Sequence, residues 1–80
     1  MFNITHYVLF QNGDAWIAQL LEKDLNGQGS TKEEALHSLK RTIWGQMEVD
    51  KHFGHILLGD LGPAPSIYWS MERCQLKLFV

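Results

Sequence analysis

The sequence predicts an α+β fold: a three-stranded antiparallel meander, a long helix packed on one face, a short second helix and a last strand. Two observations carry this prediction. Apolar residues tend to alternate before Gln28, and after Leu36 they recur every three or four positions, which are the periods of a strand and of a helix. Where the period changes, Thr31 and Glu34 form a capping box, whose hydroxyl and carboxylate satisfy orphan backbone amides at a helix start. The expected order of elements is therefore β-β-β-α-(α)-β within a single domain, residues 1–80.

The first two strands are expected to form a hairpin. Alternation predicts one strand from Phe2 to Phe10 and a returning strand from Ala15 to Leu21. Asn12 and Gly13 lie between them and are the strongest short-range hairpin signal, because both residues accept a positive φ angle.

A loop centred on this pair predicts which side chains share a face. It sets Val8 opposite Ile17 and Leu9 opposite Trp16. One face then carries Ile4, Val8, Phe10, Ile17 and Leu21, with His6 opposite Gln19. The other face carries Tyr7, Leu9, Trp16, Ala18 and Leu20. Both faces are apolar, and one helix covers only one of them, so the remaining face is expected to be closed by the C-terminal segment or to be an interaction surface.

A short third strand is expected over Leu25 to Gly29, weakened by Gly27 and Gly29, and a long helix from Lys32 to about Phe53. Gly29 fits a sharp strand-to-helix turn, because a residue without Cβ takes conformations that others cannot. Gly54 is the expected C-cap. The apolar stripe that should pack on the sheet consists of Ala35, Leu36, Leu39, Ile43 and Met47.

Trp44 falls on the opposite side of the helix from this stripe, where a large aromatic side chain needs an explanation. The favoured explanation is that the C-terminal tail folds over it, and the second is a protein interface. Gly45 beside it costs roughly 1 kcal/mol relative to alanine in a helix interior.

The C-terminal third is expected to supply a short helix from Ser66 to Arg73 and a last strand from Cys74 to Val80. A strand that rejoins a sheet after a helix most easily pairs parallel, by a right-handed crossover. The last strand is therefore expected to lie parallel beside the first. Tyr68 and Trp69 fit either a lid over the core or an interface.

The composition predicts no catalytic residue, no cofactor site and no metal site. The single cysteine, Cys74, excludes an intrachain disulfide, and Gly54 interrupts the helix between His52 and His55, the only close histidine pair. The formal net charge of −2 does not provide the clustered positive charge that nucleic-acid binding requires. Neither a signal peptide nor a membrane span is recognised, which leads us to expect a cytoplasmic location.

A family resemblance rests on the strand AWIAQ at residues 15–19, on QGST at 28–31 and on EEALHSL at 33–39. This series resembles the HicB family of bacterial antitoxins and their stand-alone relatives, over roughly residues 7–44. The PAP segment at 63–65, with Tyr68 and Trp69, resembles a tail in one branch of that family. Ser30 replaces the usual acid, and Ser38 the usual asparagine, without changing the capping.

The resemblance implies a partly reduced ribonuclease H-like fold without its nuclease site. It also implies oligomerisation and binding to HicA, a small basic toxin that cleaves messenger RNA. Many HicB proteins carry a further domain for operator DNA, for which 80 residues leave no space. The chain is therefore expected to be a short member, and operator binding is in doubt.

The leading hypothesis is a non-catalytic, homo-oligomeric, protein-binding module that neutralises such a toxin. The alternatives are a stand-alone assembly protein and a small enzyme that uses His6 or His37. The candidate partner or oligomer interface consists of Tyr7, Leu9, Trp16, Trp44, Tyr68 and Trp69. The residues assigned to structural motifs are Gly13, Gly29, Thr31 and Glu34.

Overall fold

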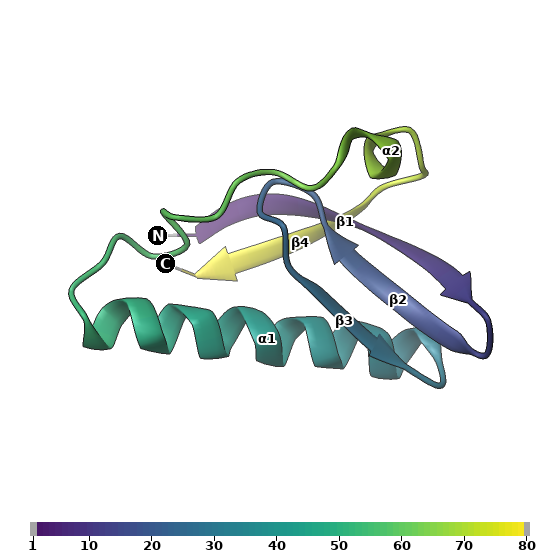
Figure 1. Cartoon of the computed structure of the whole chain (residues 1–80), viewed down its shortest axis with the longest axis horizontal. Helices are drawn as coiled ribbons and strands as arrows, with labels where there is room; N and C mark the ends of the chain where they lie inside the picture. Colours follow the sequence, from purple (N-terminus) through teal and green to yellow (C-terminus); the bar gives the residue numbers. More distant parts are fainter. Residues whose placement is uncertain (1, 80) are drawn as a thin grey trace.

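The computed structural model describes residues 2–79 and confirms the α+β architecture (Figure 1). Strands β1 (Phe2–Asn12), β2 (Ala15–Leu20) and β3 (Asn26–Gly29) precede the long helix α1 (Lys32–His52). The short helix α2 (Ser66–Trp69) and strand β4 (Cys74–Phe79) follow it. The strands form one sheet in the order β3-β2-β1-β4, so β3 and β4 are its two edges.

Strand β4 lies beside β1, as predicted, but the predicted parallel direction is wrong. The two strands are antiparallel, with Phe2 opposite Phe79 and Tyr7 opposite Cys74. The reason is that the chain crosses the length of the sheet twice between β3 and β4. Helix α1 returns along one face, and residues 55–65 then run back along the other, so β4 starts from the opposite end (Figure 1).

The hairpin between β1 and β2 has the predicted faces but a different register. Val8 lies opposite Gln19, and Phe10 opposite Ile17, so the predicted pairing is wrong by two residues. The two-residue turn is Gly13-Asp14, in which Gly13 takes the positive φ angle, 65°. Because side chains alternate with a period of two, a shift of two residues keeps every side chain on its predicted face.

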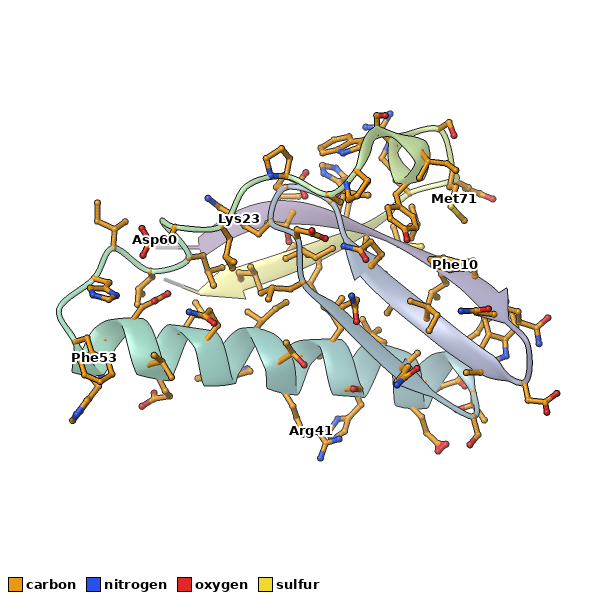
Figure 2. All side chains as sticks on the ribbon, in the orientation of Figure 1. Phe10, Lys23, Arg41, Phe53, Asp60 and Met71 are labelled. Atoms are coloured by element: carbon orange, nitrogen blue, oxygen red, sulfur yellow. The ribbon has the colours of Figure 1, made fainter. Side chains whose placement is uncertain are left out.

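Helix α1 covers the face that carries Tyr7 and Ala18, and the main core lies between them. Its buried members are Tyr7, Ala18, Leu20, Ala35, Leu39, Ile43 and Leu58. The opposite face is closed by the C-terminal segment, which was one of the two predicted outcomes. Ala64 is buried there against Val8 and Leu21, with Phe10, Tyr68, Trp69 and Met71 packed around them. Figure 2 shows Phe10 and Met71 on this side of the sheet, away from α1.

The start of α1 is as predicted. Thr31 is the N-cap, and its hydroxyl oxygen accepts a hydrogen bond from the backbone N–H of Glu34 at 3.1 Å. At the other end the C-cap is Phe53 and not the predicted Gly54, which is the next residue and takes the positive φ angle, 71°, that ends the helix. Neither helix in residues 2–79 combines the length and the apolar character that crossing a membrane requires.

The glycines of β3 allow α1 to pack closely on the sheet. A Cβ atom on the buried Gly27 would overlap the backbone nitrogen of Leu39 and lie 2.6 Å from the carbonyl carbon of Ser38. A Cβ atom on Gly29 would lie 2.5 Å from the Cβ atom of Glu34. The backbone of the helix therefore lies directly on the backbone of the strand, which no residue with a side chain permits.

We predict that Gly27→Ala destabilises the fold, whereas Gly45→Ala stabilises it. The added methyl group at position 27 meets helix backbone that cannot move aside, and overpacking of this kind costs about 1–3 kcal/mol of unfolding free energy. At position 45 no atom lies within 4 Å of an added Cβ, so the helix gains about 1 kcal/mol of propensity. Urea denaturation of both variants measures these changes. A Gly27→Ala variant as stable as the native chain would contradict the packing.

Candidate functional site

Three of the predicted interface side chains lie on the sheet face that α1 covers. Tyr7 is buried in the core, and Leu9 and Trp16 pack against the same cluster. The ammonium group of Lys32 lies 4.9 Å from the centre of the Trp16 ring. Burial and the neighbouring Cys74 thiol raise the pKa of Tyr7. The structure therefore places these three residues in the packing between sheet and helix.

Tyr68 and Trp69 lie on the other face, where they act as a lid over the second cluster. The rings of Tyr68 and Phe10 stack with their centres 5.5 Å apart. The indole N–H of Trp69 donates a hydrogen bond to the carbonyl oxygen of Ala64 at 3.1 Å, and Arg73 lies over its ring. Of the two predicted roles for this pair, the structure supports the lid.

Trp44 is different, because its side chain faces solvent with 66% of the residue exposed. The favoured explanation from the sequence, that the tail folds over it, is wrong. The tail closes the opposite face of the sheet instead, and β4 passes beside Trp44 without covering it.

Trp44 borders a groove between α1 and β4 with a volume of about 330 Å³. Its walls are Lys40, Ile43, Trp44 and Met47 from α1, and Leu76, Lys77 and Leu78 from β4. The groove exists because α1 packs mainly on β3 and β2, which leaves the leucines of β4 only partly covered. In the described part of the chain β4 pairs with β1 alone, so the groove opens onto the free edge of the sheet.

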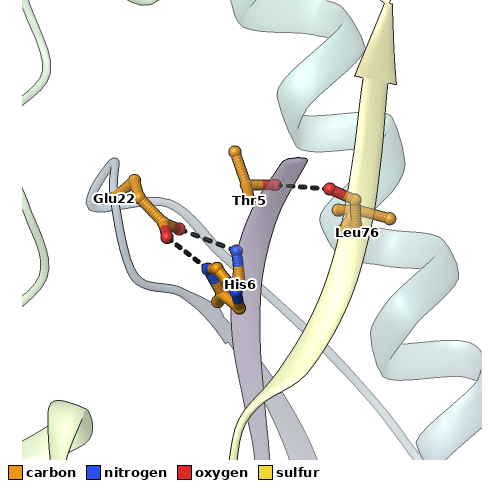
Figure 3. Close-up of polar contacts among 4 residues, drawn as sticks. All are labelled: Thr5, His6, Glu22 and Leu76. Atoms are coloured by element: carbon orange, nitrogen blue, oxygen red, sulfur yellow. Dashed lines mark hydrogen bonds and ion pairs between the residues drawn. The ribbon is translucent and has the colours of Figure 1, made fainter. Parts of the chain in front are cut away.

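A second feature is the contact between His6 and Glu22, drawn in Figure 3. One carboxylate oxygen of Glu22 lies 2.6 Å from Nδ1 of His6, and the other accepts a hydrogen bond from the backbone N–H of His6 at 2.7 Å. Both side chains are about one-third exposed. The carboxylate thus ties the end of β2 to the middle of β1.

Sequence reasoning missed this pair because it placed His6 opposite Gln19. In the structure the carbonyl oxygen of His6 accepts a hydrogen bond from the N–H of Leu21 at 2.8 Å, so Glu22 is the next residue along. Burial acts to raise the pKa of Glu22, but the hydrogen bonds from His6 outweigh it and hold the pKa below its ordinary value.

Asp50 is a buried carboxylate that the sequence did not single out. It accepts hydrogen bonds from the backbone N–H of Leu58 at 2.8 Å and from the side-chain amide of Gln46 at 3.1 Å. Leu58 has a positive φ angle, 58°, which is rare for a bulky residue. Asp50 therefore holds the turn after α1 in shape. Within residues 2–79, no three potential metal-binding side chains gather around Asp50 or elsewhere.

Comparison with known proteins found no protein family, no curated protein and no solved structure that matches this chain. The resemblance to HicB proteins therefore stays a prediction, which rests on the residues quoted for it.

We predict that Glu22→Gln destabilises the fold at neutral pH, by about 1 kcal/mol of unfolding free energy for a charge-assisted contact whose side chains are about one-third exposed. Folding lowers the pKa of Glu22 from its ordinary value of 4.5. The stabilisation of the fold by the ionised carboxylate is therefore fully present above pH 4.5, and it is lost as the pH falls through the lower pKa of the folded state. The stability difference between the native chain and the variant should therefore shrink in acid. Urea titrations at several pH values measure it, with the exposed Glu72→Gln as control; a constant difference would contradict this role.

Proposed function

We propose that this chain is a non-catalytic protein-binding module. The observation that carries the proposal is the groove in which an exposed tryptophan, two leucines and the free edge of a strand lie together. Exposed edge strands accept a further strand by backbone hydrogen bonding, while pockets beside them select side chains. Tryptophan is among the residues that most often dominate the energy of a protein interface.

For the partner, we propose a small basic toxin of the HicA type. Support comes from the resemblance over residues 7–44 and from the net charge of −2. The exposed ammonium group of Lys40 beside the groove repels a basic protein. Glu33 and Glu34 are exposed beside Gln28 on the opposite edge of the sheet, where Arg41 and His37 line the same hollow. We propose this edge, with its two carboxylates against one guanidinium group, as the surface for such a partner.

A second candidate, a small histidine-dependent enzyme, is favoured by the short contact between His6 and Glu22. A carboxylate that holds one ring nitrogen of a histidine is the usual arrangement for a general base. Against it, both carboxylate oxygens of Glu22 are engaged by His6 itself. This geometry supports a structural contact that holds β1 and the end of β2 together more strongly than it supports a catalytic site.

The toxin proposal predicts that the chain rescues growth when it is coexpressed with a small basic protein encoded beside it. Glu33→Gln with Glu34→Gln should weaken the rescue, because the variant loses negative charge at the proposed contact. The exposed Glu72→Gln is the control, and circular dichroism verifies the fold of each variant. Failure of rescue, or the lack of such a neighbouring gene, would rule out the toxin as partner. The broader proposal of a protein-binding module would remain.

His6→Ala and Glu22→Ala separate the two candidate functions. If the pair is a structural contact, both variants should lose unfolding free energy, Glu22→Ala more than His6→Ala, because only Glu22→Ala also removes the acceptor of the His6 backbone N–H. Both variants should retain rescue and partner binding where they are folded. If His6 is a base, the first variant should abolish function while its folded fraction, measured by circular dichroism, stays like that of the second. Because the geometry favours a structural contact, we expect both variants to be less stable and to keep their function when folded.

A further inference from the structure

We propose that the groove between α1 and β4 binds a small aliphatic carboxylate, a straight-chain acid of about eight to ten carbons, with its carboxylate on Lys40. The inference goes beyond the proposed function, because the ligand is a free small molecule and no protein partner is needed to bind it. The groove combines an apolar lining, one unpaired positive charge and a length that suit such a molecule.

The lining of the groove is mainly apolar, as it is in most small-molecule sites. Ile43 and Met47 lie on its α1 side, and Leu76 and Leu78 lie on its β4 side. Met47 and both leucines are only partly buried by the chain itself. The volume of about 330 Å³ lies at the lower end of the range for ligand pockets. An aliphatic chain fits this lining, and each methylene that it buries fully tightens binding by up to about fourfold.

Lys40 supplies the positive charge of the groove. The residue is exposed, and within residues 2–79 its ammonium group makes no hydrogen bond or ion pair. Lys77 contributes to the lining from β4, but its side chain alternates with those of Leu76 and Leu78 and so belongs to the other face of the sheet. A single ammonium group is a compact point charge, which one carboxylate matches. The charge of the groove therefore favours an acid with one negative group.

The charges along α1 also set the orientation of the ligand. Lys40 is the first helix residue that lines the groove, and Met47 is the last. The exposed Glu48 follows Met47 directly and repels a carboxylate at that end. The acid group therefore lies at the Lys40 end, and the end of the aliphatic chain lies beside Met47.

The length of the groove sets the length of the ligand. Met47 lies seven residues after Lys40, which corresponds to roughly 10 Å at about 1.5 Å of helix rise per residue. An extended chain with C–C bonds of about 1.5 Å advances roughly 1.25 Å per carbon. About eight carbons therefore span the groove, and carbons beyond about ten extend past Met47 into water.

Trp44 forms an aromatic wall of the groove and also reports on its occupant. The residue is 66% exposed, so a chain in the groove removes part of the indole from water. Trp16 and Trp69 pack instead against the two core clusters, on either face of the sheet. A change in tryptophan fluorescence on binding is therefore expected to come mainly from Trp44.

Titration of the native chain with sodium hexanoate, octanoate, decanoate and dodecanoate, each below its micelle concentration, tests the proposal. Tryptophan fluorescence and calorimetry should show saturable binding of one ligand per chain, with a dissociation constant on the order of 1 mM for octanoate. From hexanoate to octanoate each methylene should tighten binding by up to about fourfold, and the gain should stop at about ten carbons. Absence of saturable binding, or a gain that continues undiminished to dodecanoate, would overturn the site.

Charge reversal tests the position of the carboxylate. Lys40→Glu should weaken octanoate binding about two- to fivefold, as expected for an exposed ion pair, and should strengthen binding of octyltrimethylammonium by a similar factor. Arg41→Glu is the matched control, because it makes the same change in net charge and Arg41 points away from the sheet (Figure 2). An equal loss of octanoate affinity in both variants would overturn the contact with Lys40.

Two substitutions of Trp44 test the location of the aliphatic chain. Trp44→Phe keeps an aromatic wall, so calorimetry should still detect octanoate while the fluorescence change is lost. Trp44→Ala should weaken binding severalfold without lowering the free energy of unfolding, because the side chain is exposed. A full fluorescence change in Trp44→Phe would place the ligand elsewhere and overturn the proposal. All these measurements use the chain alone, so failure of the ligand site and failure of the protein-binding proposal are distinguishable.

Discussion

The contact between the glycines of β3 and the backbone of α1 determines how the rest of the molecule is arranged. Gly27 lets the helix approach the strand until their backbones touch, next to Ser38 and Leu39. Because α1 is held over β3 and β2, it does not reach across the whole sheet, and the leucines of β4 stay partly uncovered. Trp44 projects beside this uncovered strip. The same contact that closes the core at one edge of the sheet thus leaves a groove at the other.

The face that α1 does not cover is closed by a chain segment that backbone hydrogen bonds hold in place. The N–H of Ala64 donates to Leu21 at 2.9 Å, and the N–H of Asp24 donates to Gly62 at 2.8 Å. Asp50 shapes the turn that leads into this segment, and Glu22 secures the strand end beneath it. This second passage along the sheet also reverses the direction in which β4 enters. The tail therefore completes the core rather than forming a free arm.

Local signals in the sequence predicted the helices and strands, but they did not predict the direction and register in which distant strands pair. The N-cap at Thr31 and the change of period depend on neighbouring residues, and both predictions are confirmed. The direction of β4 depends on a passage of residues 55–65 that has no periodicity, so a single crossover was wrongly assumed. The hairpin register shifted by two because the turn uses Gly13 and Asp14 rather than Asn12 and Gly13. The sequence showed that Trp44 is unusual, but predicting its neighbours would have required the position of β4.

We propose that the outer edge of β4 and the groove beside Trp44 form a protein-binding surface. Amide hydrogen exchange of β4, followed as a function of protein concentration, tests it most directly, because pairing with a further strand protects amides that an edge strand exposes to water. We expect exchange across Cys74–Phe79 to slow as protein or a binding partner is added, together with a change in fluorescence as the Trp44 indole becomes buried. Exchange rates and fluorescence that stay the same at every concentration, and with every candidate partner added, would show that this edge and groove do not bind protein.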